Sequence, residues 1–413
     1  MVNSPYAVPM GTITKKTSYD ISVKKATDCY LWDENEKKYL DLRSGLWNVS
    51  LGYNQELYKS ALSMFDHYLS KGTPFLDINS YNHDIYHDYS ASILNFINNK
   101  KEQYKKIFYT NSGSEGTELA TKLIKHLKSK DKHIVTYDQS YHGTFFAGLS
   151  ASGIDHKITV DYAPHLEGFV TIKTPKTSVD ELAVLKYIED NHQYISAFLF
   201  EPIIGSGGVL VFNKEFIQRL YTALKRYNIL LVFDEVATGF FRTGNRFFFE
   251  ELEVSPDILI LSKSINNGIL PFGLVAISHD IYEVLEKKQT YIEHFSTQNG
   301  NILGIASAKC TLDYMIRNEK VITHNVKEIE NVIKEVGIQF NITTQGIGAM
   351  FSIPVNNSNK TMSIIDSLKD FGILCYYYMN GEEDNGITLF PPLLIDVKLL
   401  KKAMKIIARR VLS

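Results

Sequence analysis

Short runs of apolar residues alternate with helical patterns between about residue 105 and residue 280. Within each run the hydrophobicity is almost continuous, which indicates a strand that is buried on both faces, as in a largely parallel sheet. We therefore predict strands at KHIVTY (132–137), ISAFLFEP (195–202), ILLVFDEV (229–236), DILILSK (257–263) and GLVAIS (273–278).

The segments between these runs repeat apolar residues at helical spacing. Leu119, Leu123 and Leu127 lie on one face of a helix predicted over residues 115–130, and residues 214–228 show the same spacing. Strands that alternate with helices in this way predict an α/β domain with right-handed crossovers.

The two ends of the chain have a different pattern. Asp33–Glu36 reads as a turn between two short strands, and the basic amphipathic tail at residues 398–411 reads as a packing helix rather than a membrane-surface helix. We predict a large α/β domain over residues 58–312. A smaller α+β domain is expected from residues 1–57 together with residues 313–413.

Composition and charge exclude several classes of protein. A chain of 413 residues with 44% hydrophobic and 22% charged residues has ordinary globular composition and exceeds a single small core. A net charge of −2 gives no general attraction to nucleic acid or to an acidic membrane. No window approaches 18 consecutive apolar residues, so we expect no membrane span.

The N-terminus and the cysteines favour the cytoplasm. Residues 1–17 lack the charged-then-apolar layout of a signal peptide. Cys29, Cys310 and Cys375 are odd in number and far apart, so neither a disulfide framework nor a CxxC metal site is indicated.

Three predicted strands end in a charged residue: Glu201, Asp234 and Lys263. In an open α/β sheet, ligands bind beyond the carboxyl ends of the strands, and parallel strands bring these ends to one edge. One such charge would mean little, because every strand ends somewhere. An amine that meets two carboxylates at one edge indicates a site.

Two further segments could contribute to this site. Ser112, Gly113 and Ser114 directly precede an amphipathic helix, whose free amides and dipole favour a phosphate. A plain capping box, Ser112-x-x-Glu115, explains the same segment. Tyr141 follows a predicted strand and could stack on a planar ring, although a packed tyrosine is the commoner case. Amine, carboxylate, phosphate cradle and aromatic ring together describe pyridoxal 5′-phosphate, whose aldehyde forms a Schiff base with a lysine.

At this point the sequence resembles a known family, the class III aminotransferases, which are fold-type-I enzymes dependent on pyridoxal phosphate. The resemblance runs in order through most of the chain and rests on the segments YLDLRSGLWNVSLGYN, NSGSEGTELATKLIK, SYHG, EPIIGSGGV, LVFDEVATGFFRTG, SKSINNGILPFG, HFSTQNGN and LFPPL. It implies a large domain with a mainly parallel sheet flanked by helices, plus a smaller α+β lobe built from both termini.

The resemblance implies a role for each matching position. Lys263 would form the Schiff base and then move the substrate proton. Asp234 would pair with the pyridinium nitrogen, and Glu201 would support Asp234 or gate the substrate side. The implied cofactor-binding set is Gly113, Ser114, Tyr141, His142, Glu201, Asp234, Val236, Lys263 and Thr297. Within it, Val236 and Tyr141 would press on the two ring faces. Thr297 would reach the phosphate of a neighbouring subunit, which implies a homodimer.

Departures from the family pattern bear on the substrate. Amino-acid-specific relatives carry an arginine where this chain has Thr388, and no arginine occurs in residues 318–408. A bidentate clamp for an α-carboxylate is therefore missing from its usual place, although Arg242 could substitute. Phe241 replaces a usual glycine, and Trp47 matches an aromatic pocket wall; a core tryptophan is the other interpretation. We expect an acceptor aldehyde or ketone without an adjacent carboxylate.

Other readings remain open at this stage. His83 and His87 have the spacing of a zinc-peptidase pair, but aspartate stands in place of the glutamate and no third ligand is evident. On the same fold, an aminomutase or a decarboxylase is an alternative to an aminotransferase. A non-catalytic protein that binds pyridoxal phosphate is the alternative from another class.

Overall fold

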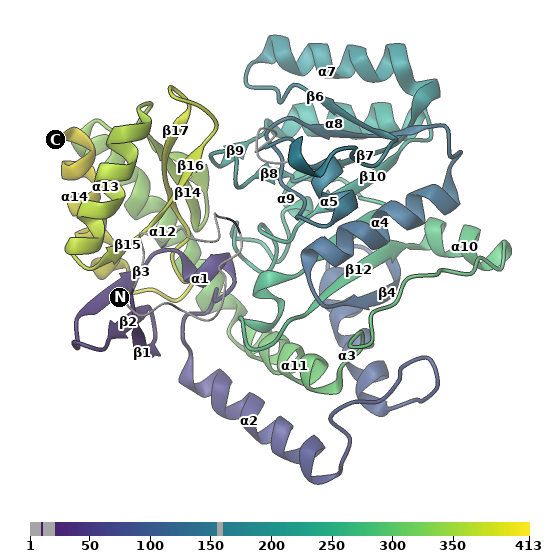
Figure 1. The fold of residues 1–413 in the computed structure, drawn as a ribbon, viewed down its shortest axis with the longest axis horizontal. Helices are drawn as coiled ribbons and strands as arrows, with labels where there is room; N and C mark the ends of the chain where they lie inside the picture. The colour runs from purple at the N-terminus through teal and green to yellow at the C-terminus, as the bar shows by residue number, and fades with distance from the viewer. Residues whose placement is uncertain (1–9, 11–20, 155–159) are drawn as a thin grey trace.

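A seven-stranded sheet forms the centre of the larger part of the molecule (Figure 1). The computed structural model describes residue 10, residues 21–154 and residues 160–413. The sheet's order is β4 (Tyr104–Thr110), β12 (Gly273–Ser278), β11 (Ile258–Leu261), β10 (Leu230–Asp234), β7 (Ile195–Phe200), β5 (His133–Tyr137) and β6 (Phe169–Ile172). Only β12 runs antiparallel to its neighbours, so the predicted, mainly parallel sheet is confirmed.

Helices cover both faces of this sheet, which is why its strands read as continuous apolar runs. Along β7 every residue is buried, and alternate side chains point to opposite faces. Phe198 joins one apolar cluster with α8 residues, whereas Leu199 joins a second cluster with α4 residues. The helices around the sheet are α4 (Gly113–Leu127), α5 (Phe146–Ala151), α7 (Ser178–Asn191), α8 (Lys214–Arg226), α9 (Phe249–Leu252) and α10 (His279–Lys287).

Both ends of the chain contribute to the smaller part of the molecule. Its first sheet contains β1 (Val23–Thr27), β2 (Tyr30–Asp33), β3 (Lys38–Asp41) and β15 (Ile373–Leu374); its second contains β13 (Gln345–Ile347), β14 (Met350–Pro354), β17 (Asn385–Leu389) and β16 (Tyr376–Met379). Because β15 pairs in parallel with β3, the two ends share one sheet. This arrangement agrees with the predicted lobe, while the domain boundaries stay a prediction.

The remaining long helices are divided between the larger and the smaller part. They are α2 (Gln55–Ser70), α3 (Asp84–Ile97), α11 (Ile302–Arg317), α12 (Glu319–Phe340), α13 (Ser358–Asp370) and α14 (Val397–Leu412). The remaining short elements are α1 (Ser44–Trp47), η1 (Val160–Tyr162), η2 (His192–Tyr194), η3 (Lys263–Asn266), β8 (Ile203–Ile204) and β9 (Leu210–Val211).

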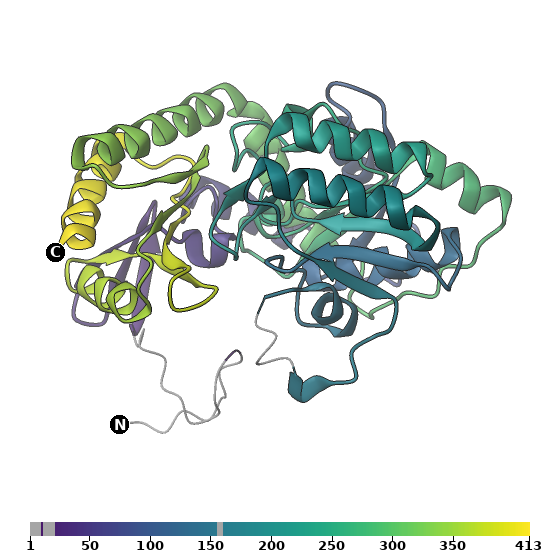
Figure 2. The same cartoon turned by 90° about the horizontal axis from the view of Figure 1, so that it is seen from above.

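The C-terminal helix α14 packs against the protein with one apolar face. Figure 2 shows it beside α12, and its residues Leu400, Met404 and Ile407 are fully buried. The predicted packing helix is therefore confirmed. No helix in the described ranges is long and apolar enough to cross a membrane. Of residues 1–17, on which the expectation about a signal peptide rests, all but Met10 lie outside the described residues.

Candidate functional site

Three neighbouring strands bring Glu201, Asp234 and Lys263 to one edge of the large sheet. Asp234 ends β10, which lies between β7 and β11. Glu201 directly follows β7, and Lys263 follows β11 after one intervening serine. Both carboxylates act electrostatically on the lysine amine. The structure thus brings together the three charges expected from the strand ends.

The amine of Lys263 lies in a partly enclosed place, against an aromatic ring. Its Nζ atom is 4.4 Å from the centroid of the Trp47 ring. Burial lowers the pKa of Lys263; the carboxylates of Glu201 and Asp234 oppose this effect, and the Arg242 guanidinium adds to it. A depressed pKa increases the neutral fraction, which is the form that acts as nucleophile or base.

Both oxygens of the Asp234 carboxylate are held from the protein side. Oδ2 lies 2.9 Å from Nδ1 of His142, and Oδ1 accepts the amide proton of Val236 at 3.1 Å. His142 is buried, and its Nε2 atom has no hydrogen-bond partner within the described ranges. His142 therefore contacts Asp234 directly and orients this carboxylate.

Glu201 anchors the loop that carries Tyr141. Its Oε1 atom accepts the amide proton of Tyr141 at 2.9 Å, and Oε2 accepts that of Gly205 at 3.1 Å. Burial raises the pKa of Glu201 to about 7; Asp234 adds to the effect, whereas His142 and the two amides oppose it. Of the two roles implied for Glu201, these contacts favour support of the site.

The N-terminus of α4 points its first amides out of the helix. Ser112 caps the helix, because its Oγ accepts the amide proton of Glu115 at 3.2 Å. The carboxylate of Glu115 accepts from the amide of Asn111 at 2.8 Å rather than from that of Ser112, so the reciprocal capping box does not form. The amides of Gly113 and Ser114 have no acceptor within the helix and remain suited to an anion.

Two glycines let the segments around this helix start approach closely. A Cβ on Gly113 would lie 2.8 Å from Cγ2 of Val236, and a Cβ on Gly143 would lie 2.3 Å from Oγ of Ser114. Gly143 also has φ of 106°, a conformation that glycine adopts readily. The start of the helix therefore lies directly against Val236 and the SYHG loop. Its amides and the nearby Asp234 carboxylate fit the phosphate and the ring nitrogen of pyridoxal phosphate.

Comparison with known proteins decides the family. The model of the class III aminotransferases matches residues 13–411. The chain belongs to the class III aminotransferases. It is therefore an aminotransferase that depends on pyridoxal phosphate, as enzymes of this family do.

Individual relatives agree over nearly the whole length. The chain is 31% identical to the acetylornithine aminotransferase of Prochlorococcus marinus, over 95% of this chain and 92% of the relative. It is 28% identical to the adenosylmethionine-8-amino-7-oxononanoate aminotransferase of Helicobacter pylori, over 93% and 90% of the two chains. Among solved structures, a transaminase from the marine bacterium Virgibacillus superposes with a TM-score of 0.88 at 26% identity, covering 98% and 97%.

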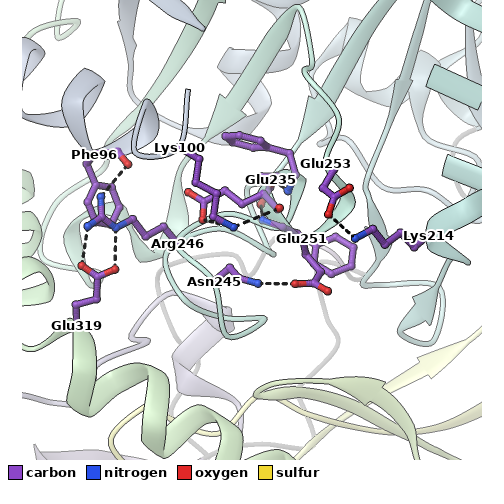
Figure 3. A network of polar contacts seen from close by, with 12 residues as sticks. Phe96, Lys100, Lys214, Glu235, Asn245, Arg246, Glu251, Glu253 and Glu319 are labelled. Atoms are coloured by element: carbon purple, nitrogen blue, oxygen red, sulfur yellow. Dashed lines mark hydrogen bonds and ion pairs between the residues drawn. The ribbon is translucent and has the colours of Figure 1, made fainter. Parts of the chain in front are cut away.

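In this aminotransferase the loop after Asp234 is fixed at its far end (Figure 3). Glu235 accepts the amide proton of Phe248 at 2.8 Å. Arg246 donates two hydrogen bonds to the carboxylate of Glu319, at 2.9 and 2.6 Å, and lies 4.5 Å from the Phe96 ring centroid. A bidentate pair of this kind restricts the guanidinium strongly. The loop is thus held between α3, α9 and α12.

Two residues expected on the substrate side of the aminotransferase lie in its interior instead. Phe241 is 1% exposed and packs with its ring 5.8 Å from that of Phe96. Arg242 is fully buried and donates to the carbonyl oxygens of Ala349, at 3.0 Å, and Pro391, at 2.6 Å. Neither side chain offers surface to a substrate in this arrangement, because residues distant in sequence close over both.

Trp47 combines both interpretations made from the sequence. It is partly buried and stacks on Phe390, with ring centroids 4.0 Å apart and an interplanar angle of 17°. At the same time its ring faces the Lys263 amine. Trp47 is thus a packed residue that also forms a wall beside the reacting group.

Two other predicted positions differ in their exposure to solvent. Thr297 is exposed in the segment between α10 and α11, near the exposed rings of Tyr291 and Phe295. Thr388 is 1% exposed on β17, and its hydroxyl has no partner among the described atoms. Among all the residues that the structure describes, no group of three His, Cys, Asp or Glu residues could hold a metal ion. His83 instead caps α3 through Nδ1.

The sequence interpretation missed several polar residues beside Lys263. Ser50 hydrogen-bonds to Ser264, and Asn267 bonds to the amide of Leu51 at 2.8 Å. Serine and asparagine in a loop carry no distinctive pattern, and these partners are more than 200 positions apart. Only the Asn-Asn-Gly stretch after Lys263 signalled a turn.

Proposed function

We propose that this aminotransferase moves an amino group from an amine or amino-acid donor to an aldehyde or ketone that lacks an α-carboxylate, in two successive half-reactions. Bound pyridoxal phosphate supplies an aldehyde that takes up the amine nitrogen and a ring that accepts electrons. Lys263 holds the cofactor and, when neutral, removes and returns the proton at the substrate carbon. Asp234, oriented by His142, keeps a proton at the ring nitrogen.

The proposal includes the other cofactor contacts that the resemblance implies. The amides of Gly113 and Ser114 bind the phosphate at the start of α4. Val236 would contact one face of the ring, and Tyr141, whose amide is anchored by Glu201, would contact the other. Trp47 forms the apolar wall on the substrate side.

The environments of Thr388 and Arg242 are the observation that supports this class of acceptor. Thr388, which the resemblance places where amino-acid-specific relatives carry an arginine, is buried. The alternative clamp, Arg242, already uses its guanidinium on the chain's own carbonyl oxygens. Neither position offers a bidentate donor to the site. A carboxylate beside the reacting carbonyl would therefore add little to the binding energy of the acceptor.

A homodimer and a cytoplasmic location complete the proposal. Thr297 is exposed and follows two exposed aromatic side chains in the sequence, Tyr291 at 80% and Phe295 at 55% exposure, which suits a surface covered by a second copy. The three cysteines are free, as expected in a reducing compartment. Mass measurement in solution tests the dimer, and a monomer at micromolar concentration contradicts it.

Replacement of Lys263 tests the enzyme assignment. Lys263→Ala should lose the visible absorption of the lysine-bound cofactor and all turnover, whereas Lys59→Ala on the exposed face of α2 should lose neither. Turnover by Lys263→Ala contradicts the assignment. The donor alone should yield a carbonyl product without carbon dioxide, which separates transamination from decarboxylation.

A matched acceptor screen tests the substrate class. Neutral aldehydes are compared with 2-oxo acids of the same chain length by kcat/KM. We expect the neutral aldehydes to be preferred. A tenfold or larger preference for the oxo acids contradicts this part of the proposal and leaves the enzyme class intact.

A further inference from the structure

A chain of hydrogen-bonded side chains ends one residue away from Lys263. Nη2 of Arg242 donates to Oγ of Ser50 at 3.1 Å, and Oγ of Ser50 shares a short hydrogen bond with Oγ of Ser264. All three side chains are buried. Arg242 thus reaches the turn that carries the reactive lysine through two hydroxyl groups.

The positive charge of the buried Arg242 guanidinium is not neutralised by a bound carboxylate among the described residues. The guanidinium donates hydrogen bonds to carbonyl and hydroxyl oxygens, and no carboxylate bonds to it within the described residues. Burial lowers the pKa of Arg242 to about 9, which still leaves it charged at neutral pH. A positive charge in a poorly polarisable interior acts on its neighbours more strongly than it would in water.

The backbone at Lys263 requires support. Its φ of 46° lies in the left-handed region, which is unfavourable for residues other than glycine. Asn267 ties the turn to the segment beyond Ser50, because its Oδ1 accepts from the amide of Leu51 at 2.8 Å and its Nδ2 donates to the carbonyl of Gly52 at 2.9 Å. The segment with Ser50 therefore braces the turn from one side.

We propose that Arg242, Ser50 and Ser264 form a positioning chain that aims the Lys263 amine and favours its neutral form. The oxygen of Ser50 accepts from the guanidinium, and its own proton can then be donated to Ser264, so the dipoles align away from the positive charge. The proposal rests on the role proposed for Lys263. It gives Arg242 an indirect function in place of substrate binding.

The test is a pH titration of the visible absorption of the cofactor-loaded enzyme, which reports the protonation of the nitrogen supplied by Lys263. Arg242→Gln removes the cation and should raise the midpoint by about one pH unit. Ser50→Ala breaks the connection and should raise it by less. Arg242→Lys keeps the charge and should remain close to the wild-type midpoint.

A double-mutant cycle and a control separate this role from a general loss of packing. Ser264→Ala should match Ser50→Ala, and the double variant should shift the midpoint no further than either single variant, because both break one connection. Ser352→Ala is the control. This variant also loses a buried hydroxyl, which donates to the carbonyl of Gly208 at 2.6 Å, but Ser352 is not part of the positioning chain formed by Arg242, Ser50 and Ser264. Its midpoint should be unchanged.

Two results overturn the proposal. One is a wild-type midpoint in both Ser50→Ala and Arg242→Gln. The other is an unchanged midpoint with a higher KM for carboxylate-bearing donors alone, which makes Arg242 a substrate clamp. If Arg242→Gln fails to fold, Ser50→Ala and Ser264→Ala decide the question. Turnover that survives Lys263→Ala contradicts the proposed function instead, so the two failures are distinguishable.

Discussion

Nδ1 of His142 lies 2.9 Å from Oδ2 of Asp234, and this contact joins the SYHG loop to the end of β10. The second carboxylate oxygen is held by the amide of Val236 at 3.1 Å. Asp234 is 5% exposed, so its orientation is set by these two partners rather than by water. A carboxylate held in this way would need no reorganisation during the reaction to pair with the ring nitrogen of bound pyridoxal phosphate.

Asp234→Asn should leave a bound but poorly reactive cofactor. The amide cannot stabilise a proton on the ring nitrogen, so the ring becomes a weaker electron acceptor. We expect kcat to fall by about 100-fold or more, in line with the loss of a positioned proton partner. Cofactor content is read from the absorption spectrum and kcat from steady-state rates, and a near-normal kcat contradicts the role.

His142→Gln should lower kcat by roughly 10- to 100-fold, since a hydrogen bond to a charged group contributes about 1.5–3 kcal/mol. The expected loss comes from a misoriented Asp234 and not from lost contact with the substrate. KM should therefore change little. His192→Gln is the matched control, because His192 bonds to the carbonyl of Glu189 and lies just before β7, at the opposite end of this strand from Glu201. Equal effects of the two substitutions would refute the orienting role.

Glu201 should make stability fall as pH rises through mildly acid values. Burial raises its pKa from 4.5 to about 7 in the folded state, so the folded protein binds more protons than the unfolded chain between these values. The contribution of this group to the free energy of unfolding therefore decreases by up to about 3 kcal/mol between about pH 4.5 and about pH 7. Above about pH 7 it stays constant.

Urea unfolding at a series of pH values checks this expectation by comparison with Glu201→Gln. The variant should show a shallower slope in that window. Glu235, whose pKa burial also raises to about 7, is present in both proteins and cancels in the difference. Identical slopes would show that Glu201 is already ionised in the folded protein at acid pH.

Thr388→Val should keep or increase stability. The Thr388 hydroxyl is buried without a partner among the described atoms, and an unpaired buried hydroxyl costs about 1–3 kcal/mol. Valine has nearly the same shape and removes that group. Thr361→Val is the contrasting variant, because the Thr361 hydroxyl donates to Asn385 at 2.8 Å and its loss should cost about 1 kcal/mol. Destabilisation of Thr388→Val to the same extent would point to an unseen partner.

Much of the fold could be predicted from local patterns. Strands covered on both faces leave continuous apolar runs, and helices that cover them leave apolar residues at every third or fourth position. The antiparallel direction of β12 could not be predicted, because side chains that are buried on both faces look the same in either direction. The Ser112 cap was predicted, whereas the hydrogen bond that the Asn111 amide donates to Glu115 depends on the local backbone path.

The sequence by itself determined that Glu201, Asp234 and Lys263 meet, because each follows a buried strand and parallel strands share one edge. Only the tertiary structure decided what surrounds them. Arg242 looked available to a substrate, yet it donates hydrogen bonds to residues 107 and 149 positions further along the chain. It also donates one to Ser50, which lies 192 positions before it. Hydrogen bonds across such separations leave no periodic trace, because they arise where independently formed elements pack together.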